Sequence, residues 1–321
     1  MNREMFYEEV KDNILSFMPE EFSRHTVRID EVLKSGGLVL HGMTLINGNK
    51  GTAPILYLEP FYDLIGEGWP VENVLSAAAE KYAEIYMLTP ELNIPDLSFE
   101  NIRKDLGIKL LYNKTNEDLL NNLVSTDIGC GYSLSVYIDL SGRVFDSAVI
   151  NVRKDMLETI GCDEQTLFEE AVRNSEVRSP ARVTYISQEL FAASNNTPKD
   201  LLSGEITYDS DMGLLVLTTA DRYAGAAALF YPQIQKRIAE IVQASYFVIP
   251  SSIHEILILP DNGEHAAKDL AEMVKAVNEN EVSPEEQLGN RVLYYDAMSA
   301  QLEVAYDLDR EKDHEIEFDR Q

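Results

Sequence analysis

The stretch YFVIPSSIHEILILP, residues 246–260, decides the class of fold because it holds two apolar runs separated by Ser251 and Ser252. Runs rich in aromatic and β-branched residues favour β-strands. A link this short cannot join parallel neighbours, which need a crossover of about a dozen residues or more. The stretch therefore predicts an antiparallel hairpin in which the two serines form the turn and their hydroxyls bond to loop amides.

The same pattern extends through the C-terminal half of the chain. From residue 214 onward it predicts the order β-β-α-β-β-α-β-β, in which residues 226–230 form the second strand and residues 219–225 a second antiparallel link. Upstream, residues 25–58 predict a β meander, and apolar residues at helical spacing predict a helix after Pro70. The predicted class is α+β, with mixed, mainly antiparallel sheets and packed helices.

A chain of 321 residues suits two domains. We predict an N-terminal α+β region over residues 1–125, made of a helix, the meander and further helices. A C-terminal α+β region is predicted over residues 126–306. Residues 307–321 are mostly charged and lack an apolar period, which predicts a solvated tail.

Composition excludes several classes of partner and of enzyme. The chain has 27 basic and 55 acidic residues, a net charge of −28 that repels phosphate backbones and anionic lipid, so neither nucleic acid nor membrane is an expected partner. An acidic N-terminus, no apolar run of membrane-spanning length and only two cysteines predict a cytoplasmic protein. Glycine-rich nucleotide loops and a GxSxG elbow are absent from the sequence, so we predict no cofactor.

His254 and Glu255 resemble the start of a zinc-protease motif, which needs a helix carrying a second histidine four residues on. Position 258 is Ile, and strand alternation sends His254 and Glu255 to opposite faces of a sheet. Ser252 and Glu255 also fit a helix capping box, so a short helix is the local alternative, although the aliphatic run favours the strand.

A metal half-site near His265 is a second hypothesis, with Asp261 or Glu264 as a further ligand. Helical spacing instead places His265 on a polar face with Asp269 and Glu272. The solvated face is the favoured interpretation, and no metal is predicted.

A hydrolase is the enzymatic alternative, with His254 as the base and Ser252, Cys130 or a bound metal as its partner. A nucleophilic cysteine usually lies at a helix N-terminus, where its pKa falls, whereas residues 132–140 after Cys130 predict a strand. The sequence therefore favours a small loop or core cysteine and leaves the question of enzyme activity open, with a non-enzyme preferred.

Arg222 and Tyr223 lie in a polar turn that precedes Gly225, for which a hairpin loop with positive φ is predicted. Rigidly held loops often carry binding residues. We predict a contact surface made of two turns, with these binding residues: Arg222, Tyr223, Ser251, Ser252 and His254.

Three segments carry a resemblance to a known family: DRYAGAAALFYP (221–232), YFVIPSSIHE (246–255) and VSPEEQL (282–288). They resemble the bacterial domain-of-unknown-function family DUF5688, over about residues 25–306. The chain is also distantly similar to the uncharacterised YtpQ-type proteins. The resemblance implies an intracellular bacterial protein without an assigned reaction, so it transfers no catalytic residue.

These observations favour an uncharacterised cytoplasmic protein that acts as a non-catalytic binding or interaction module. Two alternatives stay open: the hydrolase or metal-dependent enzyme that uses His254, and an acidic adaptor that binds a basic partner. Either a protein or a small molecule fits the role of partner.

Overall fold

The computed structural model describes residues 1–47, 53–88, 97–141, 149–191, 198–204 and 206–310. Two compact units divide the chain. Unit 1 consists mainly of Met1–Lys34 and Leu38–Leu97, and unit 2 comprises Ser35–Gly37, Ser98–Ser141 and Ser147–Gln321.

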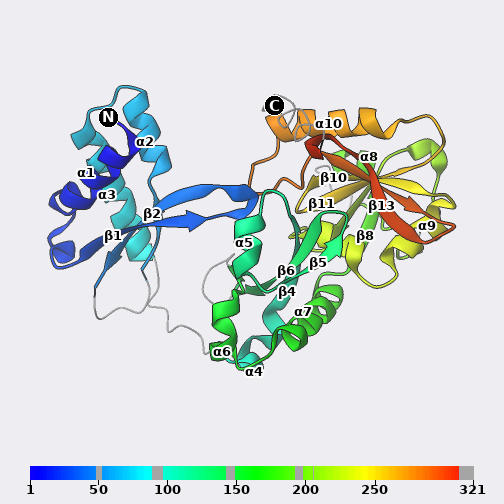
Figure 1. Ribbon diagram of the computed structural model, residues 1–321, viewed down its shortest axis with the longest axis horizontal. Helices are drawn as coiled ribbons and strands as arrows, with labels where there is room; N and C mark the ends of the chain where they lie inside the picture. Colours follow the sequence, from blue (N-terminus) through cyan, green and yellow to red (C-terminus); the bar gives the residue numbers. More distant parts are fainter. Residues whose placement is uncertain (48–52, 89–96, 142–148, 192–197, 205, 311–321) are drawn as a thin grey trace, which may run out of the picture. The chain divides into compact units, whose positions relative to one another are not determined.

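Unit 1 packs helices against a small antiparallel sheet of order β1-β2-β3 (Figure 1). Its core gathers apolar side chains from α1, α3 and the sheet, among them Phe6, Met43 and Tyr82, each with no exposed surface. The predicted meander and the helix after Pro70 are confirmed. The elements are α1 (Arg3–Asn13), η1 (Ile14–Phe17), η2 (Glu20–Phe22), β1 (Thr26–Leu33), β2 (Val39–Ile46), β3 (Leu56–Tyr57), α2 (Glu59–Gly66) and α3 (Val71–Leu88).

Unit 2 is built around a six-stranded sheet of order β13-β12-β10-β11-β9-β8, in which every neighbouring pair is antiparallel. The opening stretch forms the central hairpin. The strands are β8 (Ala181–Tyr185), β9 (Leu215–Thr219), β10 (Tyr246–Ser252), β11 (Glu255–Pro260), β12 (Arg291–Asp296) and β13 (Gln301–Asp307). The predicted α+β class with antiparallel sheets and packed helices is confirmed.

Alternation along β11 divides its side chains between the two faces of this sheet. Ile256 and Ile258 are buried at 1% and 0% exposure, whereas Leu257 and Leu259 point to the face that α10 covers in part. α10 (Ala267–Asn280) packs on β10, β12 and β13. The remaining helical elements include α8 (Ile186–Phe191), η8 (Gly225–Phe230) and α9 (Ile234–Val242).

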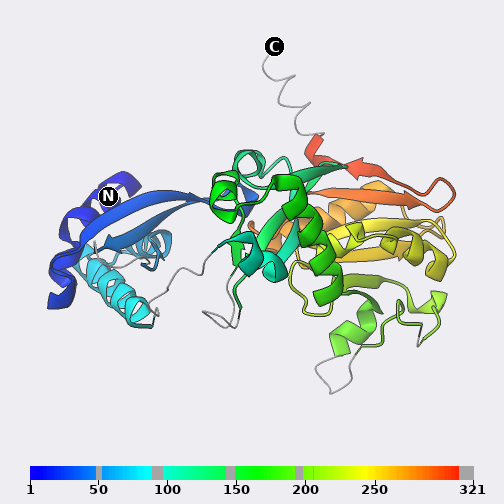
Figure 2. The same ribbon diagram turned by 90° about the horizontal axis from the view of Figure 1, so that it is seen from below.

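A second, four-stranded antiparallel sheet in unit 2 has β6 at its centre, with β4 on one side and β5 and β7 on the other. α7 packs on β4 (Figure 2), and the Ser175 hydroxyl accepts a hydrogen bond from Ile108 N. The Asp163 side chain caps α7 by accepting a hydrogen bond from Thr166 N. The elements are α4 (Phe99–Ile102), β4 (Leu106–Tyr112), α5 (Glu117–Asn122), β5 (Ser125–Gly129), β6 (Tyr132–Asp139), β7 (Val149–Asn151), α6 (Leu157–Ile160) and α7 (Glu164–Arg178).

One predicted strand is wrong: residues 226–230 belong to the 3₁₀ helix η8, so residues 219–225 link a strand to a helix. The backbone of Arg222 and Ala224 adopts positive φ values of 58° and 49°, which turns the chain out of the sheet. The following alanines lack the branched side chains that favour strands.

Two predicted boundaries fall inside strands of unit 2. Residue 125 starts β5 inside unit 2, because β4 pairs with β6 across that point. Asp307, the first residue of the predicted tail, ends β13 and is 8% exposed. Residues 311–321 lie outside the described residues.

Candidate functional site

The hairpin that carries the predicted binding residues has an irregular turn. Pro250 pairs with Ile256 and Ser252 with Glu255, so Ser251 is an extra residue in a β-bulge. The Ser252 hydroxyl oxygen accepts a hydrogen bond from His254 N at 3.1 Å, which confirms that a serine hydroxyl satisfies a loop amide. The two serines, predicted to form the turn, instead end β10, and Ile253 and His254 form the turn between the strands.

The His254 ring uses both of its nitrogens within the fold. Nδ1 accepts a hydrogen bond from Ala224 N at 3.3 Å, which leaves the proton of the neutral ring on Nε2. Nε2 lies 3.4 Å from Glu286 Oε1. The ring therefore has no free acceptor nitrogen, and Ser252 meets His254 through the backbone, so this geometry does not supply a serine–histidine pair for nucleophilic attack.

The two predicted turns meet at His254. The rings of Tyr223 and His254 lie 5.7 Å apart, and Tyr223 also packs edge-on against Tyr137 at 5.5 Å. Burial raises the pKa of the Tyr223 hydroxyl. Arg222 forms an ion pair with Glu189.

Gly225 has a different role from the predicted one, because its φ is not positive. A side chain at this position would overlap the carbonyl oxygen of His254 and the hydroxyl of Thr218. The residue is small because two backbone segments approach each other closely, and this approach fixes the turn of Arg222 and Tyr223 beside the hairpin.

Cys130 lies in the turn between β5 and β6, where Gly129, Cys130 and Gly131 all have positive φ. Its thiol donates to Leu302 O at 3.4 Å, and burial raises the pKa of the thiol. A thiolate nucleophile needs the opposite shift. Among the described residues, the interactions of Cys130 involve β12 and β13 and do not include His254 or Ser252.

The two carboxylates considered as ligands of a metal half-site form hydrogen bonds with other side chains. Asp261 accepts a hydrogen bond from the Tyr294 hydroxyl at 2.8 Å, and Glu264 accepts one from the Asn262 amide at 2.8 Å. His265 is exposed just before α10. Within the described ranges, no three His, Cys, Asp or Glu side chains converge as metal ligands.

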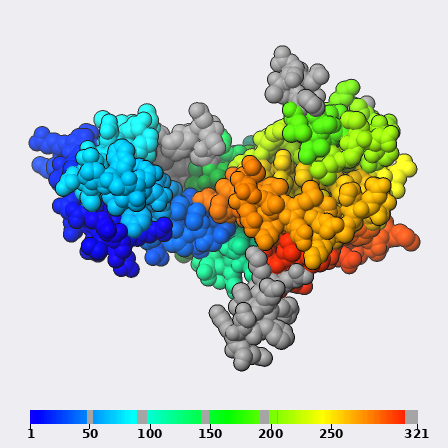
Figure 3. Space-filling view, turned by 90° about the horizontal axis from the view of Figure 1, so that it is seen from above, coloured from blue at the N-terminus to red at the C-terminus, as the bar shows by residue number. Residues whose placement is uncertain are grey.

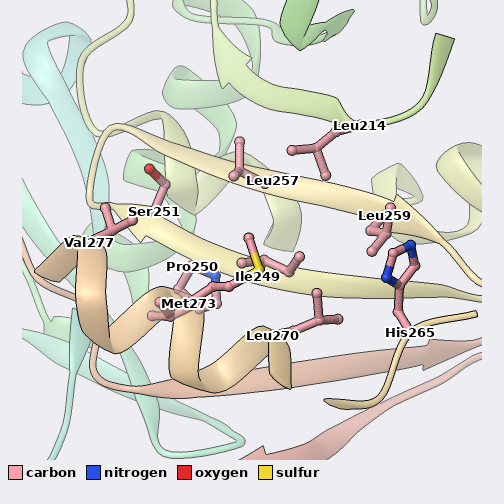
Figure 4. A pocket seen from close by; sticks show the side chains of 11 residues that line it. Leu214, Ile249, Pro250, Ser251, Leu257, Leu259, His265, Leu270, Met273 and Val277 are labelled. Carbon is pink, nitrogen blue, oxygen red and sulfur yellow. The ribbon is translucent and has the colours of Figure 1, made fainter. Parts of the chain in front are cut away.

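An apolar groove lies between β11 and α10, beside the hairpin (Figure 4). Its volume is about 270 Å³. Leu257 and Leu259 form one wall and Leu270, Met273 and Val277 the other, with Ser251 at one end and His265 at the other (Figure 4). We call this feature the β11–α10 groove; Leu214, Ile249, Pro250 and Val274 complete its lining.

Sequence patterns identify these side chains but not the groove. Met273 and Val277 belong to the apolar stripe that predicts α10, yet they are 64% and 43% exposed. Leu270 and Val274 fill the contact with the sheet at 5% and 4% exposure. The apolar stripe of α10 is wider than the surface that covers it, and only the exposures in the structure reveal this.

Comparison with known proteins gives a family for the chain. A family model matches residues 3–297. The chain belongs to DUF5688, a family of unknown function. No curated protein and no solved structure gives a significant match to this DUF5688 protein. None of its described helices has both the length and the apolar composition of a membrane span.

Proposed function

We propose that this DUF5688 protein is a non-catalytic binding module and that the β11–α10 groove, with the adjoining hairpin turn, is its binding site. The observation that carries the proposal is the exposed apolar lining of the groove. Apolar concavities bordered by polar residues are typical of ligand or partner sites. Met273 is unbranched and polarizable, a side chain suited to adaptable contacts.

The polar side chains near the groove are held by hydrogen bonds within the fold and are not arranged for catalysis. His254 is held by Ala224 and Glu286, and Ser252 by the hairpin backbone. Ser251 is the one hydroxyl of the groove lining, and its hydroxyl donates to Glu255 at 3.4 Å. These contacts favour a fixed surface for binding over a catalytic site.

The test uses Met273→Gln, which keeps an unbranched side chain of similar helix propensity but makes its end polar. The uncharged fluorescent probe N-phenyl-1-naphthylamine is titrated into the full chain. We expect affinity to fall about fivefold, because about 1 kcal/mol of apolar contact is lost.

Met298→Gln is the matched control, since Met298 is 98% exposed in the turn between β12 and β13. It should leave the affinity for the probe unchanged. Equal affinities for the wild type and Met273→Gln would contradict the groove as the site. A second variant, His254→Gln, tests the enzymatic alternative. If the wild type hydrolyses a general ester substrate and His254→Gln does not, the enzymatic alternative is favoured.

We also infer a bacterial, cytoplasmic location and a partner other than nucleic acid. Both described cysteines are free thiols, which suits a reducing compartment. The net charge of −28 opposes phosphate-rich partners. Similarity to the YtpQ-type proteins stays a prediction.

A further inference from the structure

We propose that the β11–α10 groove accepts an amphipathic segment of a partner protein, with aliphatic side chains entering the groove and lysines or arginines meeting an acidic rim. This inference rests on the proposed function and adds the chemistry of the partner. It connects two properties that the sequence shows separately, the apolar stripe of α10 and the large negative charge.

The surface position of the groove suits the side chains of a docked segment. Pockets for drug-sized ligands usually enclose about 300–1,000 Å³. The groove, at about 270 Å³, is close to the lower end of that range and lies at the surface of unit 2, where Met273 is 64% exposed. Figure 3 shows α10, in orange, on this surface. An amphipathic helix that docks into a groove presents a few anchors at positions i, i+3 or i+4, and i+7.

Carboxylates border the groove on both walls. Glu255 shares a face of β11 with Leu257 and Leu259, and it accepts the hydrogen bond from Ser251. On α10, Asp269 lies one turn before Met273 and is exposed, as is Glu272. Glu264 precedes His265 at the far end.

We call these four carboxylates the acidic rim. Among the described residues, no lysine or arginine forms an ion pair with Glu255, Glu264, Asp269 or Glu272. On α10, Lys275 pairs with Glu279 at 3.8 Å. Lys268 and Lys275 stand four residues before and three residues after Glu272, whereas no lysine stands at these spacings from Asp269.

Charge complementarity therefore selects a basic partner for this surface. Like-charged partners would be repelled both by the rim and by the net charge of −28. An apolar segment flanked by lysines or arginines would gain apolar contact in the groove and attraction at its edge. The rim pairs are exposed, so each adds only a modest free energy and depends on ionic strength.

The experiment uses two synthetic 15-residue peptides with leucines at helical spacing and either lysines or glutamates at the remaining positions. Each peptide is titrated into the full chain carrying ¹³C-labelled methionine methyl groups. We expect the lysine peptide to shift the Met273 methyl signal and to leave Met298 unchanged, whereas the glutamate peptide shifts neither.

Charge reversal of the rim tests the electrostatic part. The double variant Asp269→Lys/Glu272→Lys should bind the lysine peptide with about tenfold lower affinity at low salt, because two attractive pairs become repulsive. Glu169→Lys/Glu176→Lys is the matched control, since it makes the same change of charge at exposed positions of α7. If both double variants lose the same affinity for the lysine peptide, the peptide is attracted by the overall negative charge, and the inference is overturned.

The outcomes also separate this inference from the proposed function. If the uncharged probe requires Met273 but the two peptides bind with equal affinity, the groove binds apolar groups and the basic partner is wrong. If neither the probe nor the lysine peptide responds to Met273→Gln, both proposals fail.

Discussion

Tyr82 shows how one polar atom is accommodated in the core of unit 1. The side chain is completely buried, and its hydroxyl accepts a hydrogen bond from Leu45 N at 2.8 Å while donating one to Pro54 O at 3.1 Å. Burial is the main cause that raises the pKa of Tyr82 to about 12. A buried hydroxyl that both donates and accepts a hydrogen bond stabilises the fold only while it keeps its proton.

Tyr82→Phe should lower the free energy of unfolding of unit 1 by about 1–3 kcal/mol at neutral pH, because Leu45 N loses its partner. The unfolded chain releases the tyrosine proton near pH 10 and the folded chain at about pH 12. The contribution of Tyr82 is therefore full below pH 10 and is lost between pH 10 and 12.

Urea unfolding followed by the fluorescence of Trp69, the single tryptophan, measures this effect in unit 1. The variant should show a smaller alkaline loss of stability than the wild type. Tyr57→Phe serves as the control because Tyr57 is only half-buried. An alkaline loss of the same size in Tyr82→Phe would contradict the assignment.

At the scale of elements, the hairpin of β10 and β11 and the helix η8 are locked together by close backbone approach. Ala226 N donates to Ile253 O, and the Thr218 hydroxyl donates to His254 O at 2.8 Å. Gly225 permits this contact because it has no side chain. The position of the Arg222–Tyr223 turn therefore depends on contacts between segments far apart in the sequence.

Gly225→Ala should destabilise unit 2 by about 1–3 kcal/mol, because the added methyl group overlaps His254 O and the Thr218 hydroxyl. Gly66→Ala is the control, since a methyl group there meets no atom within 4 Å and the backbone needs no positive φ. Thermal unfolding monitored by circular dichroism compares the two. If Gly225→Ala leaves the stability of unit 2 unchanged, the hairpin and η8 can move apart with little loss of free energy.

At the scale of the whole molecule, Arg291 joins the two sheets of unit 2. Its guanidinium contacts Asp307 at 2.8 Å, the Tyr112 hydroxyl at 2.8 Å and the Cys130 carbonyl at 2.5 Å. It also lies over the Tyr112 ring at 4.5 Å. The side chains of Arg291 and Asp307 are only 6% and 5% exposed, so the buried Arg291 charge depends on Asp307, which Arg310 also approaches at 3.7 Å.

Asp307→Asn should reduce the free energy of unfolding of unit 2 by about 3–5 kcal/mol, because it leaves a buried guanidinium without its counter-charge. Glu303→Gln removes a carboxylate from the same strand at an exposed position and should change little. Chemical denaturation of both variants gives the comparison. A loss below about 1 kcal/mol in Asp307→Asn would mean that Arg291 stays solvated or finds another partner.

The sequence by itself determined the α+β class, the central hairpin and the faces of β11, because periodicity and turn residues are local properties. It also identified the Arg222–Tyr223 turn but placed the hairpin turn at Ser251 and Ser252, one step too early, and nothing local indicated that Tyr223 packs on His254. Only the tertiary structure decided that residues 226–230 form a 3₁₀ helix, that Arg291 is a buried cation and that Met273 is left exposed. Each of these three properties depends on which part of the chain, distant in sequence, packs on the residue. The local sequence pattern does not contain that information.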